Sequence, residues 1–72
     1  MSQFTHGKLS VDLETLIDQH TLAQVLQALG QVCQEKADHI EVNWQEPRTA
    51  KQWRVIGNRI FVVHGAARNR NL

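Results

Sequence analysis

The sequence predicts an all-α fold in which a short N-terminal helix precedes a long antiparallel helical hairpin. Apolar residues recur every three or four positions from Leu22 to Trp44, which is the spacing of one helix face. A proline at position 47 interrupts this pattern, and the same spacing then resumes from Ala50 to His64. Because 72 residues leave room for one small domain, we expect a single helical unit over residues 1–72.

The N-terminal part of the chain is expected to be a loose arm over residues 1–9, followed by a short helix over residues 11–19. Gly7 disfavours a helix in the arm, and Ser10 is a suitable N-cap. Asp12 and Glu14 fall in the first turn, where the helix dipole favours acidic side chains. The apolar positions of this helix are Val11, Leu13, Leu16 and Ile17.

The next helix is predicted over residues 22–45 and begins with a capping box, because Gln24 stands three residues after Thr21. Its apolar face comprises Leu22, Val25, Leu26, Leu29, Val32, Cys33, Ala37, Ile40 and Trp44. Its opposite face is rich in acid and glutamine and comprises Gln24, Gln27, Gln31, Gln34, Asp38, Glu41 and Gln45. Average steps of about 3.67 residues predict a nearly straight helix rather than a left-handed coiled coil.

A second long helix is predicted over residues 47–64, with Pro47 at its first position, and it should run back antiparallel to the first. A β-hairpin is the alternative, because β-branched residues flank the pair Gly57-Asn58 between Val55 and Ile60. We expect both tryptophans to pack in the core at the closed end of the hairpin. Residues 65–72 are expected to form a frayed basic tail.

Three segments of the chain resemble short uncharacterised helical proteins of bacteria and phages. They are Cys33-Gln-Glu-Lys-Ala-Asp-His-Ile40, Asn43-Trp44-Gln45 and Ala50-Lys51-Gln52-Trp53, and the resemblance covers roughly residues 11–60. It implies a helical hairpin, and it implies no activity, cofactor or catalytic residue.

Two such hairpins are expected to assemble into a homodimeric four-helix bundle. A chain of this length buries only about 60% of its unfolded surface, and its single cysteine, Cys33, cannot form a disulfide within the chain. One partner helix cannot cover the whole apolar face. The predicted dimer seam consists of Leu22, Leu26, Leu29, Cys33, Ala37 and Ile40. Gly30 indicates either a close helix crossing at the dimer centre or a tolerated glycine, and both alternatives stay open.

Charge is distributed unevenly along the chain. Residues 1–46 carry two lysines and seven acidic residues, a net charge of −5, whereas residues 47–72 carry six cations and no acid, a net charge of +6. Those cations are Arg48, Lys51, Arg54, Arg59, Arg68 and Arg70. The first three are spaced three apart and should form one basic ridge on the second long helix. Such asymmetry is typical of a binding surface or of a self-complementary one.

These features favour a non-enzymatic protein–protein interaction module that acts as a homodimer in the cytoplasm. Neither a membrane segment nor a cofactor is expected, since the longest apolar run is Ile60-Phe61-Val62-Val63 and glycine-rich phosphate loops are lacking. The first alternative is a small nucleic-acid-associated protein that uses the basic helix and tail. The second is a helical bundle with a metal at Glu35 and His39, which share a helix face four residues apart.

Overall fold

Three helices make up the part of the chain that the computed structural model describes, which is the backbone of residues 2–72 and the side chains of residues 7–72. They are α1 (Ser2–Gln19), α2 (Leu22–His39) and α3 (Pro47–Asn69), and a π-helical turn, η1 (Ile40–Trp44), extends α2. The prediction of an all-α fold is confirmed. The alternative β-hairpin is wrong, because residues 55–60 lie inside α3 and no described residue is in a strand.

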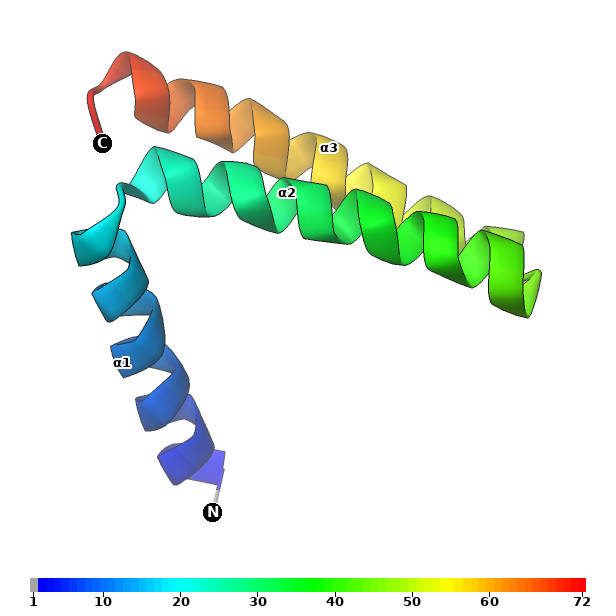
Figure 1. Cartoon of the computed structure of the whole chain (residues 1–72), viewed down its shortest axis with the longest axis horizontal. Helices are drawn as coiled ribbons and strands as arrows, with labels where there is room; N and C mark the ends of the chain where they lie inside the picture. The colour runs from blue at the N-terminus through cyan, green and yellow to red at the C-terminus, as the bar shows by residue number, and fades with distance from the viewer. Residues whose placement is uncertain (1) are drawn as a thin grey trace.

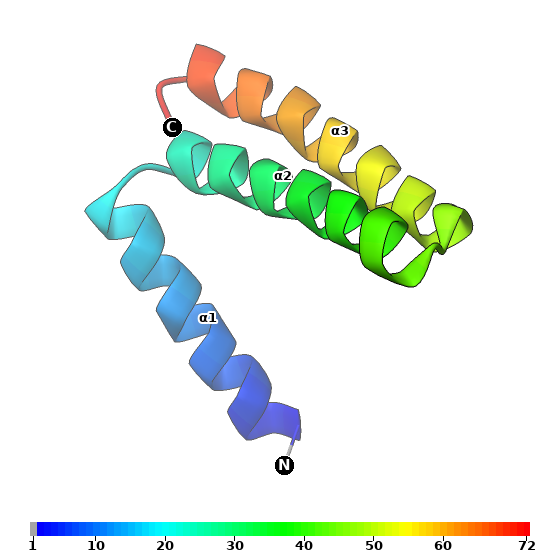
Figure 2. The same ribbon diagram turned by 45° about the vertical axis from the view of Figure 1, so that its right-hand side comes forward.

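The helices form an open, flat arrangement. Helices α2 and α3 lie side by side as an antiparallel hairpin, and α1 leaves the start of α2 at a steep angle (Figures 1 and 2). Among the residues that the structure describes, α1 contacts α2 and not α3. The chain measures 37 × 37 × 15 Å and has a radius of gyration of 14.3 Å. A compact chain of this length has a radius of gyration of about 11 Å, so the open angle leaves much surface uncovered.

Helix α1 begins earlier than the sequence predicts. Its first residue is Ser2, so the segment expected as a loose arm over residues 1–9 is helical from that point. Ser10 therefore lies within the helix and is not its N-cap. Further along, the Thr15 Oγ1 hydroxyl donates to the Val11 carbonyl at 3.0 Å, a bond that lets threonine sit in a helix interior.

The start of α2 has acceptors for its free backbone amides, as the capping box predicts. Thr21 has an extended backbone, and its Oγ1 accepts from the Gln24 amide at 3.0 Å. The two amides before it, from Leu22 and Ala23, donate to the carbonyl of Leu72 at 2.7 and 3.3 Å. The turn that follows α3 thus caps the first turn of α2. These hydrogen bonds hold the two helices together at the open end of the hairpin.

The segment expected as a frayed tail, residues 65–72, is instead ordered by a helix-ending motif. Helix α3 continues to Asn69, and Asn71 adopts a left-handed backbone with φ of 60°. The Asn71 amide donates to the Arg68 carbonyl at 3.1 Å, and the Leu72 amide donates to the Ala67 carbonyl at 2.9 Å. This pair of bonds is the Schellman motif, in which asparagine can replace the usual glycine. The turn directs the Leu72 carbonyl toward α2.

The closed end of the hairpin differs from the prediction at Trp44. The turn η1 takes more residues per turn than an α-helix, so it displaces the apolar spacing that places Trp44 on the inner face. Trp44 is 72% exposed as a result, whereas Trp53 is half-buried. The Asn43 Nδ2 amide supports this turn by donating to the His39 carbonyl at 3.1 Å. Gln45 then ends the helix in a left-handed conformation before Pro47 starts α3.

Small side chains fill the contact between α2 and α3. The buried residues are Gly30, Cys33 and Ala37 of α2 and Ala50, Gly57 and Ala67 of α3. At Gly57 a Cβ atom would lie 3.0 Å from the Cys33 Cβ and 3.3 Å from the Gly30 carbonyl oxygen. The two helices approach each other too closely there for any larger residue. The close helix crossing that Gly30 indicates is thus found within one chain.

Candidate interaction surfaces

An apolar groove lies between α1 and α2. It has a volume of about 550 Å³. Its lining residues are Leu13, Leu16 and His20 on the α1 side and Gln24, Val25, Ala28, Leu29 and Val32 on α2. Leu13, Leu16, Leu29 and Val32 are all exposed although they are large and apolar. Exposed aliphatic side chains gathered in one concave place are typical of an interaction site.

The six residues of the predicted dimer seam occupy three different environments. Cys33 and Ala37 are buried against α3 of the same chain, so they are not part of the open face. Leu22, Leu26 and Ile40 are half-buried along the same contact. Only Leu29 lines the groove, where its side chain is 46% exposed.

The groove also includes residues of α1 that the predicted seam omits. Leu13 and Leu16 carry a helical apolar spacing that is visible in the sequence. That spacing could not reveal that α1 faces the N-terminal half of α2, because this depends on the angle between the two helices.

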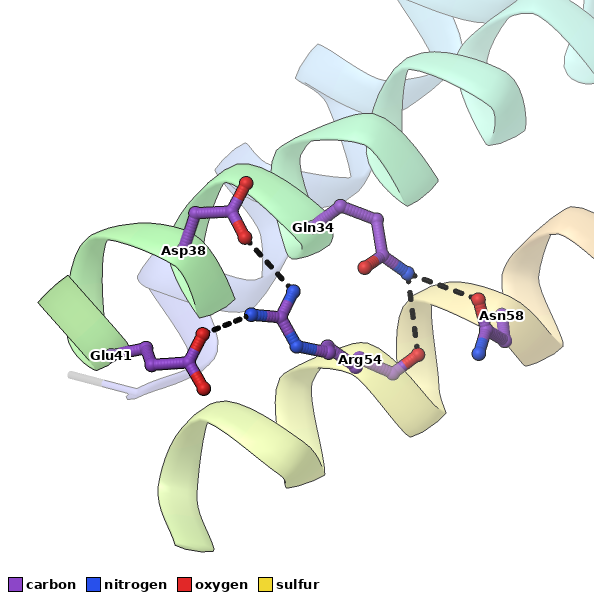
Figure 3. Close-up of polar contacts among 5 residues, drawn as sticks. All are labelled: Gln34, Asp38, Glu41, Arg54 and Asn58. Carbon is purple, nitrogen blue, oxygen red and sulfur yellow. Dashed lines mark hydrogen bonds and ion pairs between the residues drawn. The ribbon is translucent and has the colours of Figure 1, made fainter. Parts of the chain in front are cut away.

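One member of the predicted basic ridge is paired with α2. The Arg54 guanidinium donates from Nη1 to Asp38 Oδ1 at 2.9 Å and from Nη2 to Glu41 Oε1 at 2.7 Å (Figure 3). The hydrogen bonds to Asp38 and then to Glu41 raise the pKa of Arg54 above its ordinary value. A raised arginine pKa means that the charge, and the pairing that depends on it, is lost only in strongly alkaline solution. The pairing therefore persists throughout the physiological pH range.

An amide joins the same two helices next to this ion pair. Gln34 Nε2 donates to the Arg54 carbonyl at 3.3 Å and to Asn58 Oδ1 at 3.1 Å, and the labelled side chains in Figure 3 show these bonds. Gln34 reaches α3 above Gly57, where a Cβ would lie 2.7 Å from its Nε2. Part of the acid- and glutamine-rich face of α2 is thus occupied by α3.

The remaining cations do not continue the ridge as one row. Arg48, Lys51 and Arg59 are exposed on α3, and no ion pair involves them among the described residues. Arg68 is exposed near the end of the same helix. Arg70 is exposed too, and its Nη1 donates to the Ala66 carbonyl at 3.0 Å. Because Arg54 turns toward α2, the predicted ridge retains only Arg48 and Lys51 as exposed, unpaired cations among the described residues.

The metal candidates and the free thiol occupy ordinary structural positions. Glu35 and His39 are exposed on α2, and no group of three or more metal-ligating side chains occurs within residues that the structure describes. The His39 Nδ1 instead lies 3.0 Å from Asn43 Nδ2. Cys33 is a free thiol buried in the hairpin contact, where cysteine acts as a small apolar residue.

Comparisons with known proteins add no further assignment. No protein-family model matches the chain, and no curated protein or solved structure is detectably similar to it. Across the described helices, none has both the length and the apolar content that a membrane crossing needs.

Proposed function

We propose that this chain is a non-enzymatic protein–protein interaction module that acts as a homodimer, with the groove between α1 and α2 as the dimer contact. The observation that supports this most is the position of the large aliphatic side chains. Leu13, Leu16, Leu29 and Val32 are exposed, whereas the buried hydrophobic residues are a cysteine and three alanines. In a stable monomer the leucines and valines are usually the buried class.

The exposed area supports the same proposal. The chain has an accessible surface of 5947 Å², against about 4500 Å² for a compact monomer of its mass. The excess is about 1400 Å² per chain. Two chains that covered this excess on each other would bury about 2800 Å², which lies in the range of permanent dimer interfaces.

A second copy of the chain fits the groove for a reason of symmetry. Leu13 and Leu16 of α1 line the groove, and α1 and α2 diverge from their junction and leave the angle between them open (Figure 1). When two open angles face each other about a two-fold axis, α1 of each copy enters the groove of the other. Each copy then covers the groove of the other. In this arrangement α1 and α2 of both copies form a four-helix core, and α3 lies outside it.

A charged substitution in the groove tests the dimer. We expect Leu29→Asp to yield a monomer that remains helical, because the Leu29 side chain is exposed in the single chain and α2 packs on α3 without it. Two carboxylates buried in a two-fold contact should weaken association by at least about a hundredfold. Molecular mass is measured by light scattering after size exclusion, and helix content by circular dichroism.

Gln31→Asp is the matched control, because Gln31 is an exposed residue of the same helix and does not line the groove. This variant should remain dimeric. A wild-type chain that is monomeric at micromolar concentration would refute the proposed assembly. A Leu29→Asp variant that stays dimeric would show that the contact lies elsewhere.

A further inference from the structure

The face of α3 that points away from α2 carries a second exposed apolar stripe. Its aliphatic members are Val55, Ile56, Val62 and Val63, which are exposed to between 38% and 75%. Gln52 and Arg59 stand among them and are exposed as well. We call these six residues the outer α3 face. They lie opposite Ala50 and Gly57, which are buried against α2, so α3 is apolar on both sides.

The outer α3 face repeats once at the seven-residue interval that is found in coiled-coil seams. Gln52 and Arg59 are seven residues apart, and so are Val55 and Val62, and Ile56 and Val63. A seven-residue repeat of apolar positions places one continuous seam along a helix, and its usual occupant is another helix. A hollow bounded by Gln52, Trp53 and Ile56 opens beside the seam. It could receive one bulky side chain from such a helix.

The charges on α3 indicate what kind of helix would bind to the outer α3 face. Helix α3 contains no acidic residue, and Arg48, Lys51 and Arg59 are exposed cations. Arg59 lies on the same face, between the pair Val55-Ile56 and the pair Val62-Val63. A helix packed on this face would cover it. A covered guanidinium needs a carboxylate partner, and a polar residue at such a seam position specifies which helix can bind.

From these observations we infer that the outer α3 face binds an amphipathic helix of a different protein, with a leucine-type apolar stripe flanked by acidic residues. This inference rests on the proposed function as an interaction module, and the dimer enters only where it excludes α1 of a second copy as the occupant. Helix α2 lies between α1 and α3 (Figure 1), so the groove and the outer α3 face are separate surfaces. A monomer would present the same face.

A second copy of α3 is a poor occupant of this face. Arg59 lies near the middle of the outer α3 face, so two α3 helices packed antiparallel about a two-fold axis would bring the two Arg59 side chains close together. Like charges brought together within such a contact weaken the association. The leucine stripe of α1 is also engaged in the proposed dimer.

Phosphate-rich partners fit this face less well. The outer α3 face contains one cation, Arg59, among four aliphatic side chains, whereas proteins that bind nucleic acid by charge use about six to ten phosphate contacts. Helices that lie on membranes insert tryptophan, phenylalanine or leucine, and the outer α3 face carries only valine and isoleucine. Nucleic acid and anionic vesicles are therefore alternatives for the test to exclude.

The test uses a synthetic helical peptide of about three heptads with leucines on one face and glutamates beside them. A second peptide has lysine in place of every glutamate. Binding of the fluorescently labelled peptides to the full chain is followed by anisotropy. We expect the acidic peptide to bind at least about tenfold more tightly than the basic one, because each avoided like-charge contact favours it.

Two pairs of variants locate the binding to the outer α3 face. Arg59→Glu should weaken the binding of the acidic peptide by about tenfold or more. Lys8→Glu, which makes a cation acidic in α1 instead, should leave this binding unchanged. Val62→Ser should weaken it severalfold, and the control is Val11→Ser, an exposed valine of α1.

Equal affinity for the two peptides, or equal effects of the paired variants, would overturn the inference. So would tighter binding to a DNA duplex, or to phosphatidylglycerol vesicles, that Arg59→Glu abolishes. Light scattering on the same samples separates this result from the dimer. Peptide binding by a monomeric chain would refute only the dimer, and a dimer that ignores the peptides would refute only the inferred partner.

Discussion

Helix α2 contacts α3 and α1 through faces of different composition. On the α3 side, glycine, alanine and cysteine are buried in the contact. The ion pairs of Arg54 and the hydrogen bond from the Gln34 side-chain amide lie on this side too. The α1 side is open, and its leucines and valines line a groove. The chain therefore buries its smallest apolar residues and leaves several leucines and valines exposed.

This difference shows what each contact requires. Small residues let two backbones approach closely, so the α2–α3 pair depends on shape and tolerates little added volume. Exposed leucines gain little until another surface covers them, since the hydrophobic contribution scales with the apolar area removed from water. The closed contact can specify the hairpin by itself, whereas the apolar side chains of the open one stay exposed in the single chain.

The sharpest test of the closed contact is Gly57→Ala. The new methyl group would lie 3.0 Å from the Cys33 Cβ, an atom that cannot rotate away, so the helices must separate. Overpacking typically costs about 1–3 kcal/mol, and the better helix propensity of alanine returns about 1 kcal/mol. We expect a net loss of up to about 2 kcal/mol in the free energy of unfolding, measured by urea denaturation at one fixed protein concentration.

Gly65→Ala is the matched control in the same helix. Nothing lies within 4 Å of a Cβ atom at Gly65, so the substitution should stabilise the chain by up to about 1 kcal/mol. If both variants changed stability in the same direction, the two helices would not be in close contact at Gly57.

The open end of the hairpin is tested by Thr21→Ala. This change removes the hydroxyl that accepts from the Gln24 amide and should cost about 1 kcal/mol of stability. Thr15→Ala is the control, because Thr15 donates to a carbonyl within α1 and alanine is the better helix former there. Thermal unfolding followed by circular dichroism should show a lower midpoint for the first variant only. Equal midpoints would mean that the Thr21 cap adds nothing.

The smallest effect is expected for Arg54→Gln. The variant loses both ion pairs to α2, but Asp38 and Glu41 are exposed and water replaces the lost bonds. The thermal midpoint should fall slightly in dilute buffer, and the difference should shrink in about 1 M sodium chloride. Arg59→Gln, which breaks no ion pair within the described residues, should leave the midpoint unchanged. A large, salt-independent loss would instead indicate that Arg54 acts through packing.

Much of the hairpin could be predicted from local patterns in the sequence. The apolar spacing of residues 22–44, the capping box at Thr21 and the break at Pro47 each act within one or two helical turns. The start of α1 and the Asn71 turn were missed, because a serine and an asparagine are compatible with several local structures. The exposure of Trp44 follows from one π turn that no spacing rule indicates.

The sequence by itself determined that this chain is helical, that its two long helices are antiparallel and that its C-terminal half is basic, because helix periodicity and charge are local properties. Only the tertiary structure decided which apolar residues are covered. The close approach at Gly57 puts Cys33 and Ala37 inside the hairpin, and the angle of α1 leaves Leu29 in an open groove. Burial depends on how helices cross, and the crossing of two helices is a property of neither one alone.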